Sequence, residues 1–253
     1  MAPVREIVSF LDELLDPGAF ADYCPNGLQV PGRADVDRVA TGVSASLELF
    51  ERAVAIDAGL VLVHHGVFWE KAPRALSRAG AARLRALLSA EVNLVAYHLP
   101  LDAHPEVGNN ALLADGLGAT AREPFGDHGG RPVGVAARFG GDGLEAGELF
   151  ARVGEVTGRA PLVFDDGPTR VRSLGIVSGG AAGDLETAIA AELDGFLTGE
   201  PSEPAMTTAR EAGVHFIAAG HYATETFGVR RLGELLAERF GVAHDFIDVP
   251  NPV

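Results

Sequence analysis

Residues 39–66, VATGVSASLELFERAVAIDAGLVLVHHG, hold a complete strand–helix–strand pattern. Val39–Val43 is a short apolar run typical of a strand, and Leu47–Ala58 has a helical pattern. Leu60–Val63 contains only Leu and Val, which is the composition of a strand that is buried on both faces. A strand, a helix and a second strand in this order predict a βαβ unit with parallel strands.

The same alternation extends over the rest of the chain and predicts the α/β class. Before residue 126 it gives a helix that ends at Pro17-Gly18, helices at Arg83–Ala90 and Asn109–Gly116, and a strand at Val92–Tyr97. Turn-rich segments near residue 126 mark the start of a second α/β lobe. The elements expected there are helices at 144–157, 184–193, 207–212 and 224–240 and strands at 133–139, 162–164, 171–177, 196–198, 214–218 and 246–249.

Charge and composition exclude several classes of protein. The formal net charge of −15 argues against nucleic-acid binding, because phosphate contacts need Lys and Arg on one face. Cys24 is the only cysteine, so the chain can hold neither an internal disulfide nor a cysteine-based zinc site. The N-terminus does not resemble a signal peptide, and no apolar run approaches the roughly 20 residues that span a bilayer. We therefore expect a cytoplasmic protein that does not enter a membrane.

Two adjacent histidines end the apolar run of residues 60–63. Imidazole is the commonest protein ligand for transition-metal ions. Neighbouring side chains of a regular strand point to opposite faces, so His64 and His65 can address one point only if the strand ends there, as Gly66 permits. Ligand sites of open parallel sheets lie just outside the carboxyl ends of the strands, where this pair falls.

Two further clusters of metal-ligand residue types follow other strand-like runs. His98 and Asp102 come after the strand expected at 92–97, and Pro100 and Pro105 predict that this segment is extended. His98 is suited either to bind a metal or to act on the substrate as an acid or base.

The third cluster is His221 and Glu225, which share one face if a helix begins near Gly220. A carboxylate at position 225 could bridge two ions, and two ions about 3.5–4 Å apart activate water near neutral pH.

Other polar residues have simpler structural interpretations than metal binding. We interpret His128, His215 and His244 as surface or satisfied core residues, and His104 as a neighbour of a ligand or part of a turn. The glycine-rich segment 178–184 lacks the spacing of a phosphate-binding loop, which favours an ordinary strand-to-helix turn with Asp184 as a helix cap. Glu200 is placed to line a cleft.

Several long strings of the sequence resemble one family, in the same order and from near Asp22 to the C-terminus. They are CPNGLQV (24–30), HHGVFW (64–69), YHLPLDAHPEVGNN (97–110), TGEPSE (198–203), GHYATE (220–225) and FIDVPNPV (246–253). The chain resembles the NIF-three-like dinuclear-metal family, whose members are also called GTP cyclohydrolase 1 type 2 homologues. It is compact, without the extra domain that longer members insert, and Tyr222 stands where some relatives have a second histidine.

The resemblance implies a metal site and an architecture. The matching motif positions imply that two divalent metals are held by five residues, with the glutamate as a bridge: His64, His65, Asp102, His221 and Glu225. Mixed imidazole and carboxylate donors admit Zn, Fe, Mn, Co or Ni. The implied fold is two α/β lobes, residues 1–125 with 220–253 and residues 126–219, with the metal site at the lobe interface. Similar members assemble as toroidal homohexamers.

Two functions remain open from the sequence. The first is a metal-dependent hydrolase of the GTP cyclohydrolase 1 type 2 kind, in which metal-activated water attacks a purine ring or a similar small substrate, possibly a nucleotide. His98 and Glu200 are the residues expected to move protons in that reaction, and His104 is a further candidate. The second is a non-catalytic metal-binding scaffold or adaptor. Five side chains shared by two ions leave coordination positions for water or substrate, which favours catalysis.

Overall fold

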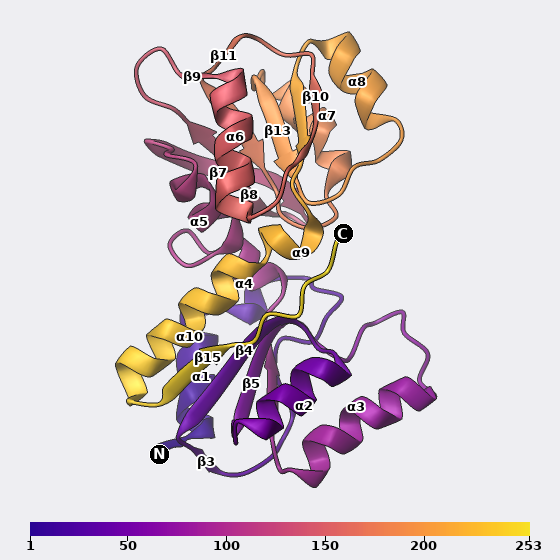
Figure 1. Cartoon of the computed structure of the whole chain (residues 1–253), viewed down its shortest axis with the longest axis vertical. Coiled ribbons are helices and arrows are strands. Elements are labelled where there is room, and N and C mark those ends of the chain that lie inside the picture. The colour runs from indigo at the N-terminus through magenta and orange to yellow at the C-terminus, as the bar shows by residue number, and fades with distance from the viewer. The chain divides into compact units, whose positions relative to one another are not determined.

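The computed structural model describes all 253 residues and shows a chain of two compact units (Figure 1). Unit 1 comprises residues 1–101 and 228–250, and unit 2 comprises residues 102–227 and 251–253. The lobe boundaries expected from the sequence were 125/126 and 219/220; strand β7 (Ala121–His128), which spans the first of them, belongs to the sheet of unit 2. The α/β class expected from the alternating pattern is confirmed.

Unit 1 is built on a five-stranded sheet in the order β15-β4-β5-β6-β2. The strands are β2 (Gly27–Val30), β4 (Arg38–Ser44), β5 (Leu60–His65), β6 (Asn93–Ala96) and β15 (Ala243–Phe246). Strands β15, β4, β5 and β6 run parallel, and β2 is antiparallel to β6 at the edge. The C-terminal segment thus completes the first sheet, as the family resemblance implied. Two short strands, β1 (Ala2–Pro3) and β3 (Asp35–Val36), pair separately.

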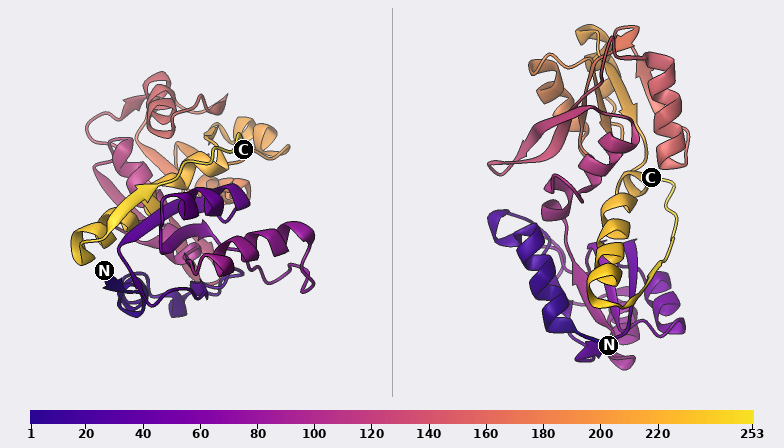
Figure 2. Two further views of the ribbon diagram at one scale, coloured as in Figure 1. Left: turned by 60° about the horizontal axis from the view of Figure 1, so that its bottom comes forward. Right: turned by 90° about the vertical axis from the view of Figure 1, so that its left-hand side faces the viewer.

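Helices cover both faces of this sheet (Figures 1 and 2). They are α1 (Val4–Leu15), the 3₁₀ turn η1 (Pro17–Ala19), α2 (Leu47–Ala55), α3 (Arg78–Ser89) and most of α10 (Thr226–Phe240). Alternation along β5 sends Val61 and Val63 into one core with Phe50 of α2 and Leu87 of α3. Burial of each such side chain contributes about 2 kcal/mol. Helices α1 and α10 are neighbours, since the ring of Phe10 lies 5.8 Å from that of Phe240.

Unit 2 has a mixed six-stranded sheet in the order β10-β14-β13-β12-β8-β7. Its further strands are β8 (Arg131–Arg138), β10 (Leu162–Asp165), β12 (Ser173–Ile176), β13 (Gly195–Thr198) and β14 (His215–Ala218), and a separate pair is β9 (Leu144–Glu145) with β11 (Arg170–Val171). Only β12, β13 and β14 run parallel. The helices are α5 (Asn109–Gly116), α6 (Ala146–Thr157), η2 (Ala182–Asp184), α7 (Leu185–Ala190), α8 (Ala205–Ala212) and α9 (His221–Thr224).

Three sequence expectations about local structure are wrong. The strand expected at 246–249 lies at 243–246, where it forms β15. The segment after His98 is not extended but forms helix α4 (Leu99–Ala103), because Pro100 falls in the first helical turn, where its missing N–H costs no hydrogen bond. The strand expected at 171–177 is two strands in different sheets. The chain breaks between them because the N–H groups of Arg172 and Ser173 both donate to the carboxylate of Asp194, at 2.7 and 3.0 Å.

A buried asparagine ties the segment after β2 to the sheet. Asn93 is 2% exposed; its Oδ1 accepts from the N–H of Gly32 at 2.8 Å, and its Nδ2 donates to the carbonyls of Arg33 and Gly59 at 2.9 and 3.0 Å. We therefore expect Asn93→Ala to lower the free energy of unfolding of unit 1 by about 3 kcal/mol, since three backbone groups lose a partner. Urea denaturation followed by circular dichroism measures this loss. Glu51→Ala, at an exposed position of α2, is the matched control and should leave the midpoint unchanged.

Candidate metal centre

Three histidines of unit 1 form a compact cluster at the carboxyl ends of β5 and β6. His64 and His65 are the last two residues of β5, and His98 follows β6. One ligand nitrogen from each lies within 4.8 Å of those from the other two. His64 and His98 are buried, at 0% and 5% exposure, and His65 is partly exposed. The sequence named all three residues, and the structure brings them together.

Both members of the histidine pair belong to the strand, which the sequence reasoning did not expect. The rings of His64 and His65 are 4.7 Å apart and inclined by 47°, so two side chains from opposite faces still approach each other at the strand end. Gly66 follows because a Cβ there would lie 2.2 Å from the side-chain amide of Gln29. The Oε1 of that amide accepts from the N–H of Val67 at 2.9 Å and fixes the turn that leaves β5.

Oxygen acceptors hold the Nδ1 atoms of the pair. The Nδ1 of His64 lies 3.0 Å from the carbonyl oxygen of Tyr97, which can only accept, so Nδ1 carries the proton and Nε2 carries the lone pair. The Nδ1 of His65 lies 3.0 Å from the hydroxyl of Ser44 on the neighbouring strand β4. A second partner on the far nitrogen is the usual way in which proteins orient a histidine toward a metal.

Asp22 performs the same task for the third histidine. Its Oδ1 lies 2.8 Å from the Nδ1 of His98, and its Oδ2 accepts from the N–H of Leu99 and from Asn26. Burial raises the pKa of Asp22, but the hydrogen bond and charge of His98, with the bond from Asn26, outweigh burial and hold the pKa below its usual value. A charged carboxylate therefore faces the His98 imidazole.

Aromatic rings enclose the histidine cluster. Trp69 meets His98 edge-on at 5.3 Å and His65 at 5.8 Å. Tyr23 meets His98 at 5.0 Å and Trp69 at 5.8 Å. These rings reduce the contact of the imidazoles with water and so strengthen electrostatic interactions in the cluster. Asp22, Ser44 and Tyr23 escaped the sequence reasoning because nothing in their spacing links them to histidines 21 or more residues away.

A second group of candidate ligands lies in unit 2. The Nε2 of His221, in α9, is 3.1 Å from Oε1 of Glu225, and its Nδ1 is 2.5 Å from Oε1 of Glu200. The expected helix start is confirmed, since Gly220 is the residue before α9. Burial lowers the pKa of His221, but the hydrogen bonds and charges of Glu225 and Glu200 outweigh it and raise the pKa to about 9. Glu225 itself is 3% exposed.

Asp102 is held in the same unit by neutral donors. Its Oδ1 accepts from Nδ2 of Asn109 at 2.8 Å and from the hydroxyl of Ser178 at 3.0 Å. Asp102 is 8% exposed, so these bonds replace water at one of its two carboxylate oxygens. The carboxylate is thereby fixed in orientation by two side chains that carry no charge of their own.

The glycine-rich segment 178–184 makes room for these ligands. Gly179 has φ +68°, and a Cβ there would lie 2.4 Å from Oε1 of Glu225 and 3.2 Å from Nε2 of His221. The segment is a strand-to-helix turn, as expected, but Asp184 makes no side-chain cap and binds Nε2 of His128 at 3.0 Å instead. Glycine is needed here because backbone and carboxylate approach each other closely.

The remaining histidines have structural roles. Nε2 of His215 contacts the carbonyl of Pro168 at 2.8 Å, and Nε2 of His244 contacts the hydroxyl of Thr41 at 2.8 Å. Nδ1 of His104 accepts from two backbone N–H groups, those of residues 106 and 107, and closes a turn. These contacts agree with the structural readings that the sequence favoured for the three residues.

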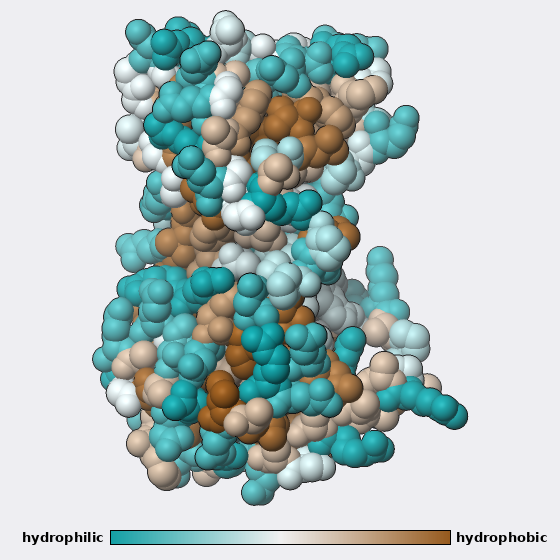
Figure 3. Space-filling model, in the orientation of Figure 1, coloured by the Kyte–Doolittle hydropathy of each residue, from teal (hydrophilic) through white to brown (hydrophobic).

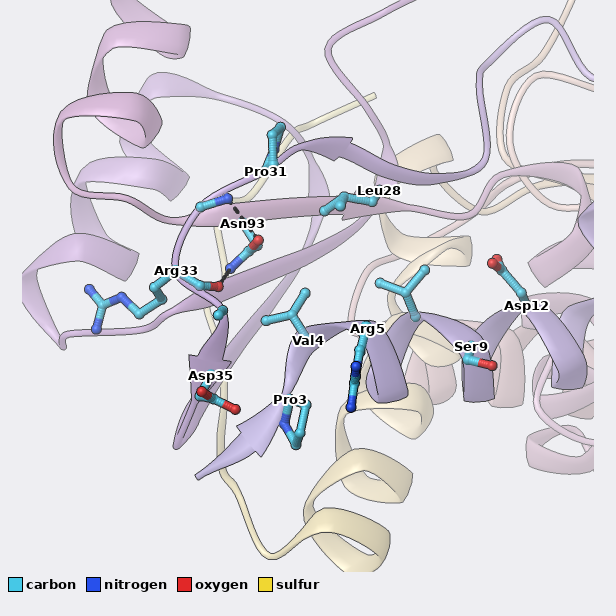
Figure 4. Close-up of a pocket in the computed structure, with 13 residues that line it drawn as sticks. Pro3, Val4, Arg5, Ser9, Asp12, Leu28, Pro31, Arg33, Asp35 and Asn93 are labelled. Atoms are coloured by element: carbon cyan, nitrogen blue, oxygen red, sulfur yellow. Dashed lines mark hydrogen bonds between the residues drawn. The ribbon is translucent and has the colours of Figure 1, made fainter.

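The donor sets of the two groups fit divalent transition metals. Three imidazoles in unit 1 and one imidazole with buried carboxylates in unit 2 are the nitrogen and oxygen donors that such ions accept. A cavity of about 770 Å³ elsewhere in unit 1, between α1 and the segment after β2, is lined by none of these residues (Figure 4). The candidate chemistry therefore lies with the ligand clusters and not with that cavity.

Comparison with known proteins shows where this chain belongs. The family described as Duf34/NIF3 (NGG1p interacting factor 3) matches residues 2–252. The chain is a member of the Duf34/NIF3 family. It is 44% identical over 246 residues to a GTP cyclohydrolase 1 type 2 homolog of Pseudomonas aeruginosa, with 97% of each chain covered. It is 43% identical to the protein of that name from Vibrio cholerae, with 98% of each chain covered.

Solved structures agree with the Duf34/NIF3 assignment. A crystal structure of a protein from Thermus thermophilus has a TM-score of 0.91 and 37% identity to this chain, covering 99% of it and 100% of that protein. A protein named ybgI, described as of unknown function, has a TM-score of 0.93 at 39% identity, with 99% and 100% covered. The resemblance inferred from the sequence strings is thus confirmed.

No helix of this chain is both long and apolar enough to cross a membrane.

The raised pKa of His221 gives a prediction for this Duf34/NIF3 chain without metal. We expect its imidazole to titrate near pH 9 in metal-free protein. Because the folded pKa exceeds the unfolded value of about 6.5, the stabilisation is complete below pH 6.5 and is lost as pH rises through about 9. NMR of the histidine rings measures the midpoint, which should fall in Glu225→Gln and stay unchanged in the exposed control Glu203→Gln. An unchanged midpoint in Glu225→Gln contradicts this assignment.

Proposed function

We propose that the protein binds two divalent metal ions and is a metal-dependent hydrolase of the GTP cyclohydrolase 1 type 2 kind. The observation that carries this proposal is the orientation of the candidate ligands. Oxygen atoms hold the Nδ1 of His64, His98 and His221, which leaves Nε2 as the nitrogen directed to a metal. The three histidines lie at or just after the carboxyl ends of parallel strands, which is where ligands bind in such sheets.

In the proposed centre the ligands are His64, His65, Asp102, His221 and Glu225, with Glu225 as the bridge. The native ion is Zn, Fe, Mn, Co or Ni, since each accepts mixed imidazole and carboxylate donors. A cation that binds beside Glu225 would replace the proton of His221. Ion binding is therefore expected to strengthen as pH rises toward 9.

The chain's own residues supply orientation and proton transfer. When bound, the two ions supply Lewis acidity and lower the pKa of water to about 7. His98 lies in the same cluster as His64 and is backed by Asp22, so it can accept a proton at Nε2 while the carboxylate stabilises the resulting imidazolium. Glu200 holds Nδ1 of His221 and can take up the proton that this nitrogen carries.

The substrate we propose is a small molecule with a purine or similar ring, by analogy with the name of the relatives. The proposed reaction is hydrolysis of a bond of that ring, with His98 and Glu200 in place to move the protons. The assembly as a toroidal homohexamer and the cytoplasmic location expected from the sequence are parts of the same proposal.

The alternative is a non-catalytic metal-binding scaffold or adaptor. The family description as an interacting factor favours it, because that description names a protein partner and no reaction. The two functions differ in whether substrate is turned over. Metal content alone does not separate them.

Turnover tests the catalytic proposal. We expect the metal-loaded protein to convert GTP or a member of a panel of phosphoesters and cyclic amides, and Glu225→Ala to lose more than about 100-fold of that rate because the bridging ligand is gone. Product formation followed by chromatography measures the rate. If metal binds stoichiometrically and no compound turns over faster than with Glu225→Ala, the scaffold function is favoured.

Metal content tests the ligand assignment. We expect His64→Ala and Asp102→Ala each to lower the metal content from two ions per chain to one or none, while circular dichroism shows a folded protein. Elemental analysis of dialysed protein gives the content. His128→Ala removes a histidine outside both clusters and should keep two ions. Wild-type metal content in both ligand variants would rule out the assignment.

A further inference from the structure

A basic segment lies shortly after the histidine pair in the chain. From residue 71 to residue 90 there are five cationic side chains and no acidic one: Lys71, Arg74, Arg78, Arg83 and Arg85. All are exposed except Arg83, which is half-buried, and none forms an ion pair. In a chain with a formal net charge of −15, this run is a local positive surface, which would attract an anionic ligand.

Two of these arginines line a cavity in unit 1. The cavity has a volume of about 310 Å³ and lies between the loop after β5 and the first turns of α3. Arg74 and Arg83 line it together with the aromatic rings of Phe68 and Trp69. Glu70 is the one carboxylate in the lining, so the cations outnumber the anions. The volume is at the lower end of the range of small-molecule sites, about 300–1,000 Å³.

The cavity shares a wall with the histidine cluster. Trp69 lines the cavity, and the same ring lies 5.3 Å from His98 and 5.8 Å from His65. A planar group stacked on Trp69 would therefore be separated from the imidazoles by the width of one side chain. Figure 3 shows hydrophilic side chains projecting from the part of unit 1 that carries this loop and α3.

The larger cavity of unit 1 lacks this combination. Its charged residues are two cations and two anions, Arg5, Arg33, Asp12 and Asp35, so its lining carries no net charge (Figure 4). No aromatic ring lines it, and no candidate ligand does either. The smaller cavity is therefore the better candidate for an anionic compound with a ring.

We propose that the cavity beside Trp69 binds a phosphorylated small molecule with a planar heteroaromatic ring. Arg74 and Arg83 bind the phosphate, because guanidinium groups match phosphate oxygens in geometry and charge. Trp69 stacks on the ring. This inference deepens the proposed function and rests on it in one respect, that the bound compound is the substrate of the metal centre.

Tryptophan fluorescence of this chain reports on Trp69, the only tryptophan, which lines the cavity and also contacts His98, so the titrations are carried out on metal-free protein. We expect guanosine monophosphate to quench the fluorescence of the full-length protein in a saturable way. Guanosine and inorganic phosphate should each bind about 10-fold more weakly or less, since each lacks one of the two contacts. A response to a single-stranded oligonucleotide with none to the mononucleotide would overturn the proposal in favour of nucleic acid.

Matched variants assign the phosphate contact. Arg74→Gln and Arg83→Gln should each weaken binding of guanosine monophosphate by about 10-fold or more, and Arg83→Lys should recover part of the loss. Arg85→Gln removes an exposed cation that does not line the cavity and should change the affinity far less. Equal affinities in the three glutamine variants would refute the site. Should Arg83→Gln fail to fold, Arg74 lies in the exposed loop and keeps the test decisive.

The metal variant separates this inference from the function proposed above. His64→Ala should lose metal and keep the quenching by guanosine monophosphate. If His64→Ala loses metal but guanosine monophosphate quenches neither this variant nor the wild type, the cavity is refuted and the metal centre still stands. Nucleotide quenching in a wild-type protein that binds no metal would refute the metal centre and leave the cavity standing.

Discussion

The hydrogen bond between Nδ1 of His64 and the carbonyl oxygen of Tyr97 is the constraint on which the candidate centre of unit 1 depends. It joins the ends of two adjacent parallel strands, β5 and β6, at a distance of 3.0 Å. A fully buried imidazole is costly unless its polar atoms are satisfied, and the carbonyl can only accept. The bond thus selects one tautomer and one ring orientation. The positions of His65 and His98 then follow from the strand ends, because His65 comes directly after His64 and His98 comes directly after Tyr97.

Parallel strands explain how much of this could be predicted from sequence. Val61 and Val63 alternate with Leu60 and Leu62, all buried, and this pattern of a doubly covered strand shows in the sequence without any structure. The carboxyl ends of such strands meet at one edge, so residues that end them become neighbours. The histidines and their grouping could therefore be predicted from the sequence. The first boundary between the units could not, because β7 spans the position expected for it and pairs in the sheet of unit 2.

The errors have equally physical causes. Pro100 was read as a helix breaker, although a proline in the first turn has no hydrogen bond to lose. Asp22 was missed because its partner His98 is 76 residues away, and only the fold brings the two together. The net charge of −15 also hides a run of twenty residues that holds five cations. Composition describes the whole surface, whereas recognition depends on local charge.

The orienting partners described here come from the same unit as the side chains that they hold. Tyr97, Ser44 and Asp22 serve the histidines of unit 1, while Glu200, Ser178 and Asn109 serve the ligands of unit 2. Each unit thus folds with its own ligands already directed, and little side-chain entropy remains to be lost when an ion binds. His221 differs because it must lose a proton before it can bind an ion, and this loss costs free energy. Its raised pKa therefore makes ion binding at this residue sensitive to pH. A cation that binds beside Glu225 would therefore have to displace the proton of His221, so the affinity of the unit 2 ligands for an ion is expected to depend on pH.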